Sequence, residues 1–218
     1  SIQEPIATPP PPPERSPIYL RPPRHSIAPP VCVVSVKIKA YLHEGVDEDR
    51  YRDFIERVAV YYRRQGVCVQ FVVSEVIQLG PEESCGVSRG ANDVINCVGP
   101  GVGGYYGPPW YRVGLNTRYP WGFDTNWGLH CAVHEFGHFF GVQDLYWLRS
   151  TPDSPYQAPR VPWPTEVMFD PYLTTPIFSE ESLRVIRTNL QRIAQGSVDN
   201  MLLVRDRMTT HLTVTVPL

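Results

Sequence analysis

The run of eleven residues from His134 to Asp144, HEFGHFFGVQD, constrains this chain more than any other segment. His134 and His138 lie four positions apart, so on an α-helix they project from the same face, about 6 Å apart. Two imidazoles so placed can bind one metal ion. Glu135 stands beside the first histidine, where a carboxylate reaches a metal-bound water without being a ligand itself.

The residues around this pair argue against the alternative of an amphipathic helix with two surface histidines. The flanking side chains are mostly apolar, and unpartnered histidines among them would be costly. These neighbours are Cys131, Ala132, Val133, Phe136, Phe139 and Phe140.

Gly141 falls where the helix has to stop, because glycine adopts the left-handed conformation without a Cβ clash. We expect Asp144 to return toward the metal as a third ligand, leaving one position for water, as in catalytic zinc sites. A rival third ligand would be Glu166, Glu180 or Glu181. The last two lie at a predicted helix start, where exposed acids are ordinary.

This pattern resembles the metzincin metallopeptidases, whose motif HExxHxxGxxH precedes a methionine-containing turn beneath the metal. Asp144 replaces the third histidine, which resembles the snapalysin branch. The match is dense from Trp127 to Asp144 and loose elsewhere. The resemblance implies an α+β fold: a mixed, mostly parallel twisted sheet, a backing helix, an active-site helix, and a small irregular C-terminal subdomain with a C-terminal helix.

The resemblance also implies a methionine turn, for which we choose Met168 in TEVMFDPY. The alternative is a core methionine that fills an irregular gap. Related families place a tyrosine two residues beyond the methionine, but here that position is Asp170. Tyr172 or Tyr146 can supply the hydroxyl that stabilises a transition state, although each also reads as a packing residue.

The other histidines carry no comparable spacing. His130 is four residues before His134, but three ligands from one straight helix splay too far apart, so we expect it to line a cleft or to pack. His43 begins HEGVD, which has no second histidine. His25 and His211 lie in a proline-rich arm and a terminal strand.

Hydrophobic periodicity predicts the elements around the motif. Alternation over residues 31–42 indicates a strand covered on one face, and residues 67–79, 93–98 and 111–116 indicate further strands. Between the first two strands we expect a helix that Asp47 caps and Gly66 ends. Its apolar stripe consists of Tyr51, Phe54, Ile55, Val58 and Tyr62.

Two later segments have simpler readings. The resemblance places GPGVGGYYGPPWY, residues 99–111, at an antiparallel sheet edge that binds an extended peptide, and the alternative is a surface loop. Ser179 predicts the cap of a helix over 180–195. Residues 211–216 alternate like a strand whose partner the sequence leaves open.

We expect three parts: a proline-rich N-terminal arm over 1–30, an N-terminal subdomain over 31–141 with the sheet and the zinc-binding helix, and a C-terminal subdomain over 142–218. The run Pro9 to Pro13 cannot form a helix or a sheet ladder. The start at Ser1 without a signal-peptide pattern suggests a mature or trimmed form.

Five cysteines allow two pairs in 15 ways. Cys85 and Cys97 bracket a loop and are the first choice for a disulfide, Cys32 and Cys68 begin two predicted strands, and Cys131 is expected to be a buried thiol. No cysteine has the paired spacing of a structural zinc site, so disulfides in an extracellular setting are favoured.

Composition agrees with a small secreted enzyme. The formal charge of −2 argues against nucleic acid as a partner, and no apolar run approaches the roughly 20 residues of a membrane span. We expect a monomer that binds a protein or peptide substrate in extended form, with one catalytic Zn²⁺. The sequence decides nothing about Ca²⁺.

The function expected is that of a secreted zinc metalloendopeptidase, with His134, His138 and Asp144 as ligands and Glu135 as the general base. Two alternatives stay open. One is a metzincin-fold binding or adhesion module with a mainly structural zinc, and the other is a hydrolase restricted to glycosylated or proline-rich chains.

Overall fold

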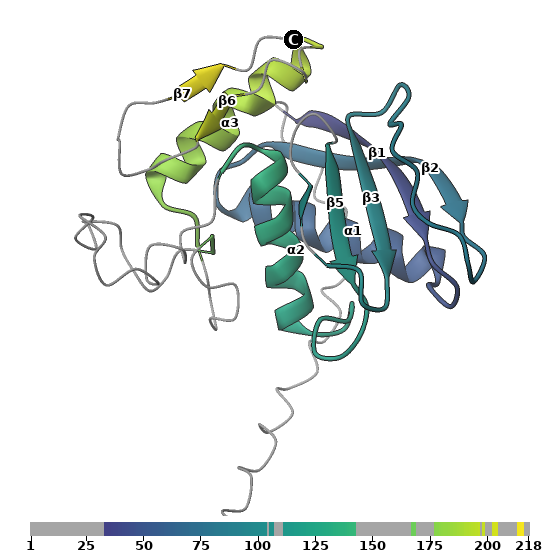
Figure 1. Ribbon diagram of the computed structural model, residues 1–218. Coiled ribbons are helices and arrows are strands. Elements are labelled where there is room, and N and C mark those ends of the chain that lie inside the picture. The colour runs from purple at the N-terminus through teal and green to yellow at the C-terminus, as the bar shows by residue number, and fades with distance from the viewer. Residues whose placement is uncertain are drawn as a thin grey trace, which may run out of the picture.

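The computed structural model describes residues 33–103, 105–106, 111–142, 167–168, 177–196, 198, 202–204 and 213–215 (Figure 1). Within these residues the chain is α+β. A mixed sheet is combined with helices α1, α2 and α3, and a small two-stranded sheet follows near the C-terminus.

The main sheet has five strands in the order β2-β1-β3-β5-β4. Strands β2, β1, β3 and β5 run parallel to one another, and only β4 runs antiparallel, against β5 at the sheet edge. This confirms the prediction of a mixed, mostly parallel sheet, including the antiparallel edge expected in the segment 99–111. The strands are β1 (Val34–Leu42), β2 (Val69–Gln78), β3 (Val94–Gly99), β4 (Tyr105–Tyr106) and β5 (Arg112–Asn116).

Helix α1 (Glu48–Arg64) connects β1 to β2. The side chain of Asp47 accepts a hydrogen bond from the backbone N–H of Arg50 at 2.8 Å, so it satisfies one of the amides that a helix start leaves unpaired. Gly66 follows the helix with a φ of 74°. Both predicted boundaries are confirmed, and the whole predicted apolar stripe is buried.

Helix α2 (Asn126–Phe139) carries the histidine motif. The hydroxyl of Thr125 accepts from the N–H of Gly128 at 2.8 Å and starts the helix. At the other end, the N–H groups of Gly141 and Val142 donate to the carbonyls of His138 and Gly137, at 2.8 and 3.0 Å. With φ of 91° at Gly141, this is a Schellman turn, as the sequence predicted for this glycine.

Helices α1 and α2 share one hydrophobic core with the sheet. The rings of Phe71 on β2 and Phe136 on α2 lie 4.5 Å apart, and the hydroxyl of Tyr62 on α1 donates to the carbonyl of Val133 at 2.7 Å. Burial raises the pKa of Tyr62 well above its ordinary value. Each large apolar side chain buried here stabilises the fold by about 1.5–3 kcal/mol, which fixes α2 against the sheet.

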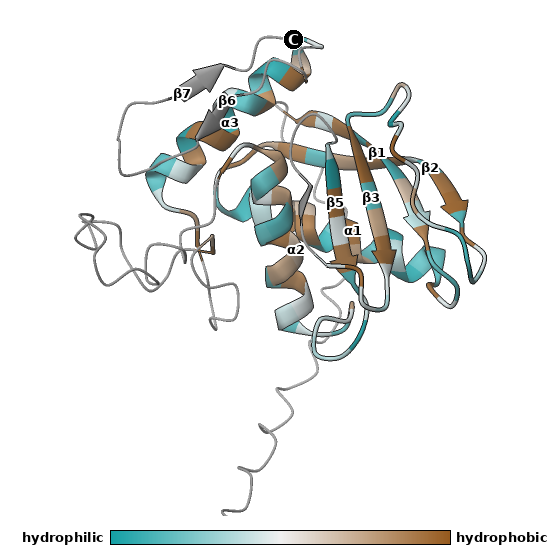
Figure 2. Ribbon diagram, viewed as in Figure 1, coloured by the Kyte–Doolittle hydropathy of each residue, from teal (hydrophilic) through white to brown (hydrophobic). Residues whose placement is uncertain are grey.

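The other face of the sheet carries a smaller cluster. Neighbouring residues of a strand point to opposite faces, so Ile95 and Cys97 of β3 lie here while Val94 and Val98 lie in the main core. The central strand β3 is therefore buried along its whole length and is mostly hydrophobic (Figure 2). The cluster consists of Tyr41, Leu79, Cys85, Ile95 and Cys97.

Helix α3 (Glu180–Ala194) begins at Ser179, whose hydroxyl accepts from the N–H of Ser182 at 3.3 Å, as predicted. The buried amide of Asn189 donates to the carbonyl of Phe140 at 2.7 Å and so joins α3 to the end of α2. Strand β6 (Leu202–Val204) pairs antiparallel with β7 (Thr213–Thr215), which supplies the partner that the sequence left open.

The arm over 1–30 and most of the segment 142–176 lie outside the described residues, and the proposed subdomain boundaries stay predictions. Among the residues described, no helix has the length and hydrophobicity needed to cross a bilayer.

Candidate metal centre on helix α2

The two histidines of the motif meet on one face of α2. Their Nε2 atoms lie 3.1 Å apart, and the side chains are only 5% and 7% exposed. The four-residue spacing therefore brings the two imidazoles together inside the protein.

A backbone carbonyl orients each ring. Nδ1 of His134 donates to the carbonyl of Val167 at 2.9 Å, and Nδ1 of His138 donates to the carbonyl of Val142 at 2.8 Å. A carbonyl oxygen can only accept, so the hydrogen-bond network assigns the proton to Nδ1 in both rings. In the neutral form of each ring, Nε2 then presents a lone pair, which is the form in which histidine binds a metal.

Two lone pairs that face each other at this distance repel unless a cation or a proton lies between them. For a tetrahedral zinc with Zn–N bonds of about 2.0–2.1 Å, two nitrogen ligands are about 3.4 Å apart. The measured separation of 3.1 Å is close to that value. The donor set and its geometry therefore fit a zinc ion.

Glu135 faces a different part of the site. It lines a cavity of about 240 Å³ between α2 and β5, the volume of about eight water molecules. Other walls include Leu115, Trp121 and Phe123, which are apolar. The carboxylate that follows His134 in the sequence thus lines a largely apolar space beside α2.

Cys131 lies one helical turn before Glu135 and lines the same cavity. It keeps its thiol, as predicted. The expectation that it is buried is wrong, because its side chain is partly exposed on the cavity side of α2.

Met168 is fully buried beneath the histidine helix. A Cβ added to Gly137 would lie 2.5 Å from its sulfur, so the missing side chain of Gly137 lets the turn at Val167 and Met168 approach α2. This contact brings the Val167 carbonyl to His134. The sequence did not identify Gly137, Val167 or Val142 as parts of the site, because backbone carbonyls leave no side-chain signal.

Several predicted residues lie outside the described part of the chain: Asp144, Glu166, Tyr146, Tyr172, His25 and His211. Their proposed roles stay predictions. His130 is buried and packs its ring edge-to-face with Tyr61 at 5.5 Å, which agrees with the packing role expected for it.

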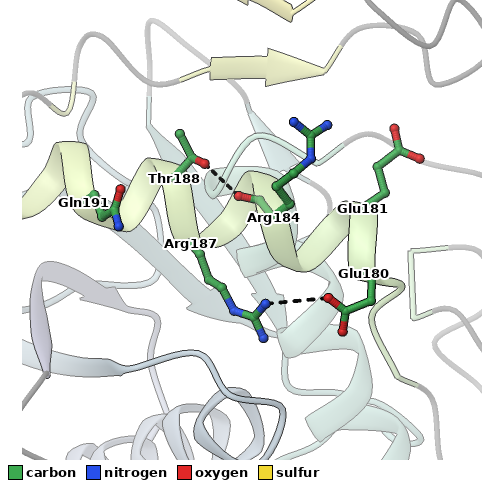
Figure 3. Close-up of a pocket in the computed structure, with 6 residues that line it drawn as sticks. All are labelled: Glu180, Glu181, Arg184, Arg187, Thr188 and Gln191. Atoms are coloured by element: carbon green, nitrogen blue, oxygen red, sulfur yellow. Dashed lines mark hydrogen bonds and ion pairs between the residues drawn. The ribbon is translucent and has the colours of Figure 1, made fainter.

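Glu180 and Glu181 lie in the first turn of α3, beside a shallow hollow of about 450 Å³ (Figure 3). Glu180 is paired with Arg187 at 3.7 Å and its side chain is 87% exposed. Arg184, Arg187, Thr188 and Gln191 line the rest of the hollow. The residues of this hollow form a solvent-exposed helix face. The ion pair of Glu180 with Arg187 agrees with the expectation that Glu180 is an ordinary exposed acid at a helix start.

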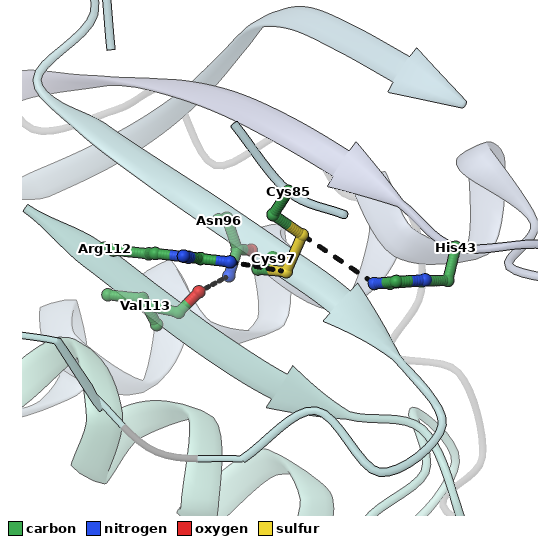
Figure 4. The surroundings of a disulfide bond; sticks show 6 residues. All are labelled: His43, Cys85, Asn96, Cys97, Arg112 and Val113. Carbon is green, nitrogen blue, oxygen red and sulfur yellow. Dashed lines mark hydrogen bonds between the residues drawn. A yellow bond between two sulfur atoms is a disulfide. The ribbon is translucent and has the colours of Figure 1, made fainter. Parts of the chain in front are cut away.

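The predicted disulfide between Cys85 and Cys97 is confirmed (Figure 4). Cys68 is also disulfide-bonded, and Cys32, which begins the other predicted strand, lies outside the described residues. His43, for which we predicted no role, lies next to the bridge between Cys85 and Cys97: ligand atoms of the three residues are all within 4.8 Å of one another.

Comparison with known proteins identifies no family for this chain. The chain matches no protein family model and no curated protein. Solved structures do match, among them one described as "Structure of a chaperone-substrate complex", with 11% identity and a TM-score of 0.49. That match covers 75% of this chain, and this chain covers 36% of the matched one.

Proposed function

We propose that this protein is a zinc-dependent endopeptidase of the metzincin type, with His134, His138 and Asp144 as ligands. The observation that carries the proposal is the pair of Nε2 atoms 3.1 Å apart, in two rings that are each oriented by a backbone carbonyl at Nδ1.

A zinc ion bound there would supply Lewis acidity for activating water and polarising a carbonyl. The chain's own base is Glu135. It accepts a proton from the water whose oxygen attacks the scissile carbonyl carbon, and it then gives that proton to the leaving amine nitrogen as the C–N bond breaks. A site with a purely structural metal would have no use for this carboxylate beside the cavity.

The surroundings of Glu135 suit a peptide substrate. Strand β4 is the last strand of the sheet, so an extended chain can pair with its outer edge through main-chain hydrogen bonds. The cavity between α2 and β5 can receive one apolar side chain of that peptide, against Leu115, Trp121 and Phe123. The disulfide between Cys85 and Cys97 supports an extracellular place of action.

Met168 fits the methionine turn of this proposal. It packs directly against the segment of α2 between the two histidines. Its part is to position the helix and the Val167 carbonyl, and it has no chemical step of its own.

The test is hydrolysis of casein or a quenched peptide library by the purified chain, with and without a chelator, together with zinc analysis. Glu135→Gln is expected to keep zinc but to lower kcat/KM at least about 100-fold, the usual contribution of a general base. Glu44→Gln is the matched control, because Glu44 also follows a histidine but is exposed after β1. Full hydrolysis by the zinc-loaded Glu135→Gln protein would show that the role assigned to this residue is wrong.

A further inference from the structure

We propose that reduction of the Cys85–Cys97 disulfide creates a second zinc site, formed by His43, Cys85 and Cys97. The imidazole nitrogen and the two sulfurs already lie within 4.8 Å of one another. The site is on the face of the sheet that carries the smaller cluster (Figure 4), and nothing in it depends on the proposed peptidase function.

Two of the three ligands lie on, or directly after, the neighbouring parallel strands β3 and β1. His43 directly follows β1, and its backbone N–H donates to the carbonyl of Val98 on β3 at 2.9 Å. Cys97 precedes Val98 on the same strand. A Cβ at Gly99 would lie 2.7 Å from the Cβ of His43, so glycine at this position allows the imidazole to sit against β3. The sheet therefore holds His43 and Cys97 in place without the disulfide.

Cys85 belongs to the loop between β2 and β3. Its sulfur lies 3.8 Å from Nε2 of His43, and both cysteines are almost fully buried, at 6% and 4% exposure. While the disulfide is intact, the sulfurs carry no negative charge, so the three residues do not form a thiolate site. Reduction makes it possible for both sulfurs to become thiolates, next to the imidazole of His43.

Arg112 favours that charged form. Its Nη2 atom lies 3.6 Å from the sulfur of Cys97, and a neighbouring cation stabilises a thiolate over a thiol. One sulfur of the bridge thus has a guanidinium beside it and the other has an imidazole, as Figure 4 shows.

The reaction balances with a water-soluble trialkylphosphine as the reductant. Phosphine, water and the disulfide give phosphine oxide and two thiols, and Zn²⁺ then displaces one proton from each thiol. With Zn–S bonds of about 2.3 Å, the two sulfurs move to about 3.8 Å apart. Two thiolates and an imidazole favour zinc over magnesium or calcium. The metal then keeps the loop attached to the sheet after the covalent bond is lost.

The experiment titrates the reduced, full-length protein with Co²⁺ under anaerobic conditions, because thiolate ligands give an intense near-ultraviolet charge-transfer band. The band is expected after reduction and not before it. The His134→Ala/His138→Ala variant should keep the band, since the α2 centre contains no sulfur. The outcome is therefore independent of whether the peptidase proposal holds.

Variants assign the ligands. Cys85→Ser and Cys97→Ser should abolish the band, whereas Cys131→Ser and Cys68→Ser should keep it. His43→Gln should weaken Co²⁺ binding at least about tenfold. A reduced wild-type protein without the band, or unchanged affinity in His43→Gln, overturns the proposal.

A second measurement needs no variant and so does not depend on correct folding of mutants. Two equivalents of Zn²⁺ per chain, enough to fill the α2 centre as well, should protect Cys85 and Cys97 of the reduced wild-type chain from alkylation, read by peptide mass mapping, while Cys131 is still labelled. Equal labelling of all three cysteines with and without Zn²⁺ also overturns the proposal.

Discussion

The carbonyl of Val142 accepts the Nδ1–H of His138 at 2.8 Å, so the turn that ends helix α2 also orients the second histidine. Gly141 makes this possible. With its φ of 91° it reverses the chain directly after the helix and brings Val142 back over His138. The turn that ends α2 is therefore part of the candidate metal centre.

We predict that Gly141→Ala weakens zinc binding as well as stability. A Cβ in the left-handed region costs about 1–2 kcal/mol, and relaxing the turn moves the Val142 carbonyl away from His138. Gly196→Ala is the matched control: it also follows a helix, with a φ of 74° and open space around its Cα. Denaturant unfolding and competitive zinc titration should show similar stability losses for both variants but a weaker zinc affinity for Gly141→Ala alone. Equal zinc affinities would mean that the turn does not orient His138.

A second prediction concerns the contact between Gly137 and Met168. Alanine is better than glycine inside a helix by about 1 kcal/mol, yet the new methyl would lie 2.5 Å from the methionine sulfur. Gly137→Ala should therefore destabilise the protein, by about 1–3 kcal/mol as overpacked cores do, and lower its zinc affinity by displacing the Val167 carbonyl.

The matching double variant, Gly137→Ala/Met168→Ala, separates the contact from the loss of methionine itself. Met168→Ala alone should cost about 2–5 kcal/mol through the cavity that it leaves. Because the added methyl then enters space that the methionine left, the double variant should be more stable than the sum of the two single effects. Strict additivity in a double-mutant cycle would contradict the packing described here.

Stability should fall steeply at high pH. Burial raises the pKa of both Tyr51 and Tyr62 above the ordinary value of a tyrosine. Above pH about 10 the unfolded chain releases these protons while the folded chain retains them, so the free energy of unfolding should decrease by about 1.4 kcal/mol per pH unit for each tyrosine. Below that pH neither group contributes a slope.

The measurement is urea unfolding between pH about 9 and about 11. Tyr62→Phe should have a shallower slope than the wild type, and Tyr119→Phe, which alters a tyrosine that is 80% exposed, should keep the wild-type slope. Tyr62→Phe should also lose about 0.5–1.5 kcal/mol at neutral pH, because the bond to the Val133 carbonyl is removed.

Zinc should stabilise the oxidised protein through the α2 centre. At a free concentration about 1,000 times the Kd, binding to the folded state adds about 4.1 kcal/mol, and chelation should remove this gain. Thermal unfolding with and without zinc gives the readout. His134→Ala/His138→Ala should show no zinc-dependent shift in Tm, and an undiminished shift in that variant would place the ion elsewhere.

The sequence predicted where helices begin and end, because the interactions that cap or stop a helix involve residues only a few positions apart. Asp47 and Ser179 cap helices because their side-chain oxygens reach amides three residues on, and Gly66 and Gly141 end helices because they tolerate positive φ. The pairing of Cys85 with Cys97 also followed from a short loop.

The sequence by itself determined that His134, Glu135 and His138 share a helix, because helical periodicity is a local property. Only the tertiary structure decided what surrounds them. The Val167 carbonyl, Met168 and the imidazole of His43 reach their partners across 33, 31 and 42 positions of the chain. Such contacts depend on how the sheet and helices pack together. Several of them are made by backbone carbonyls or depend on the missing side chain of a glycine. Neither feature can be recognised from residue types in a single sequence.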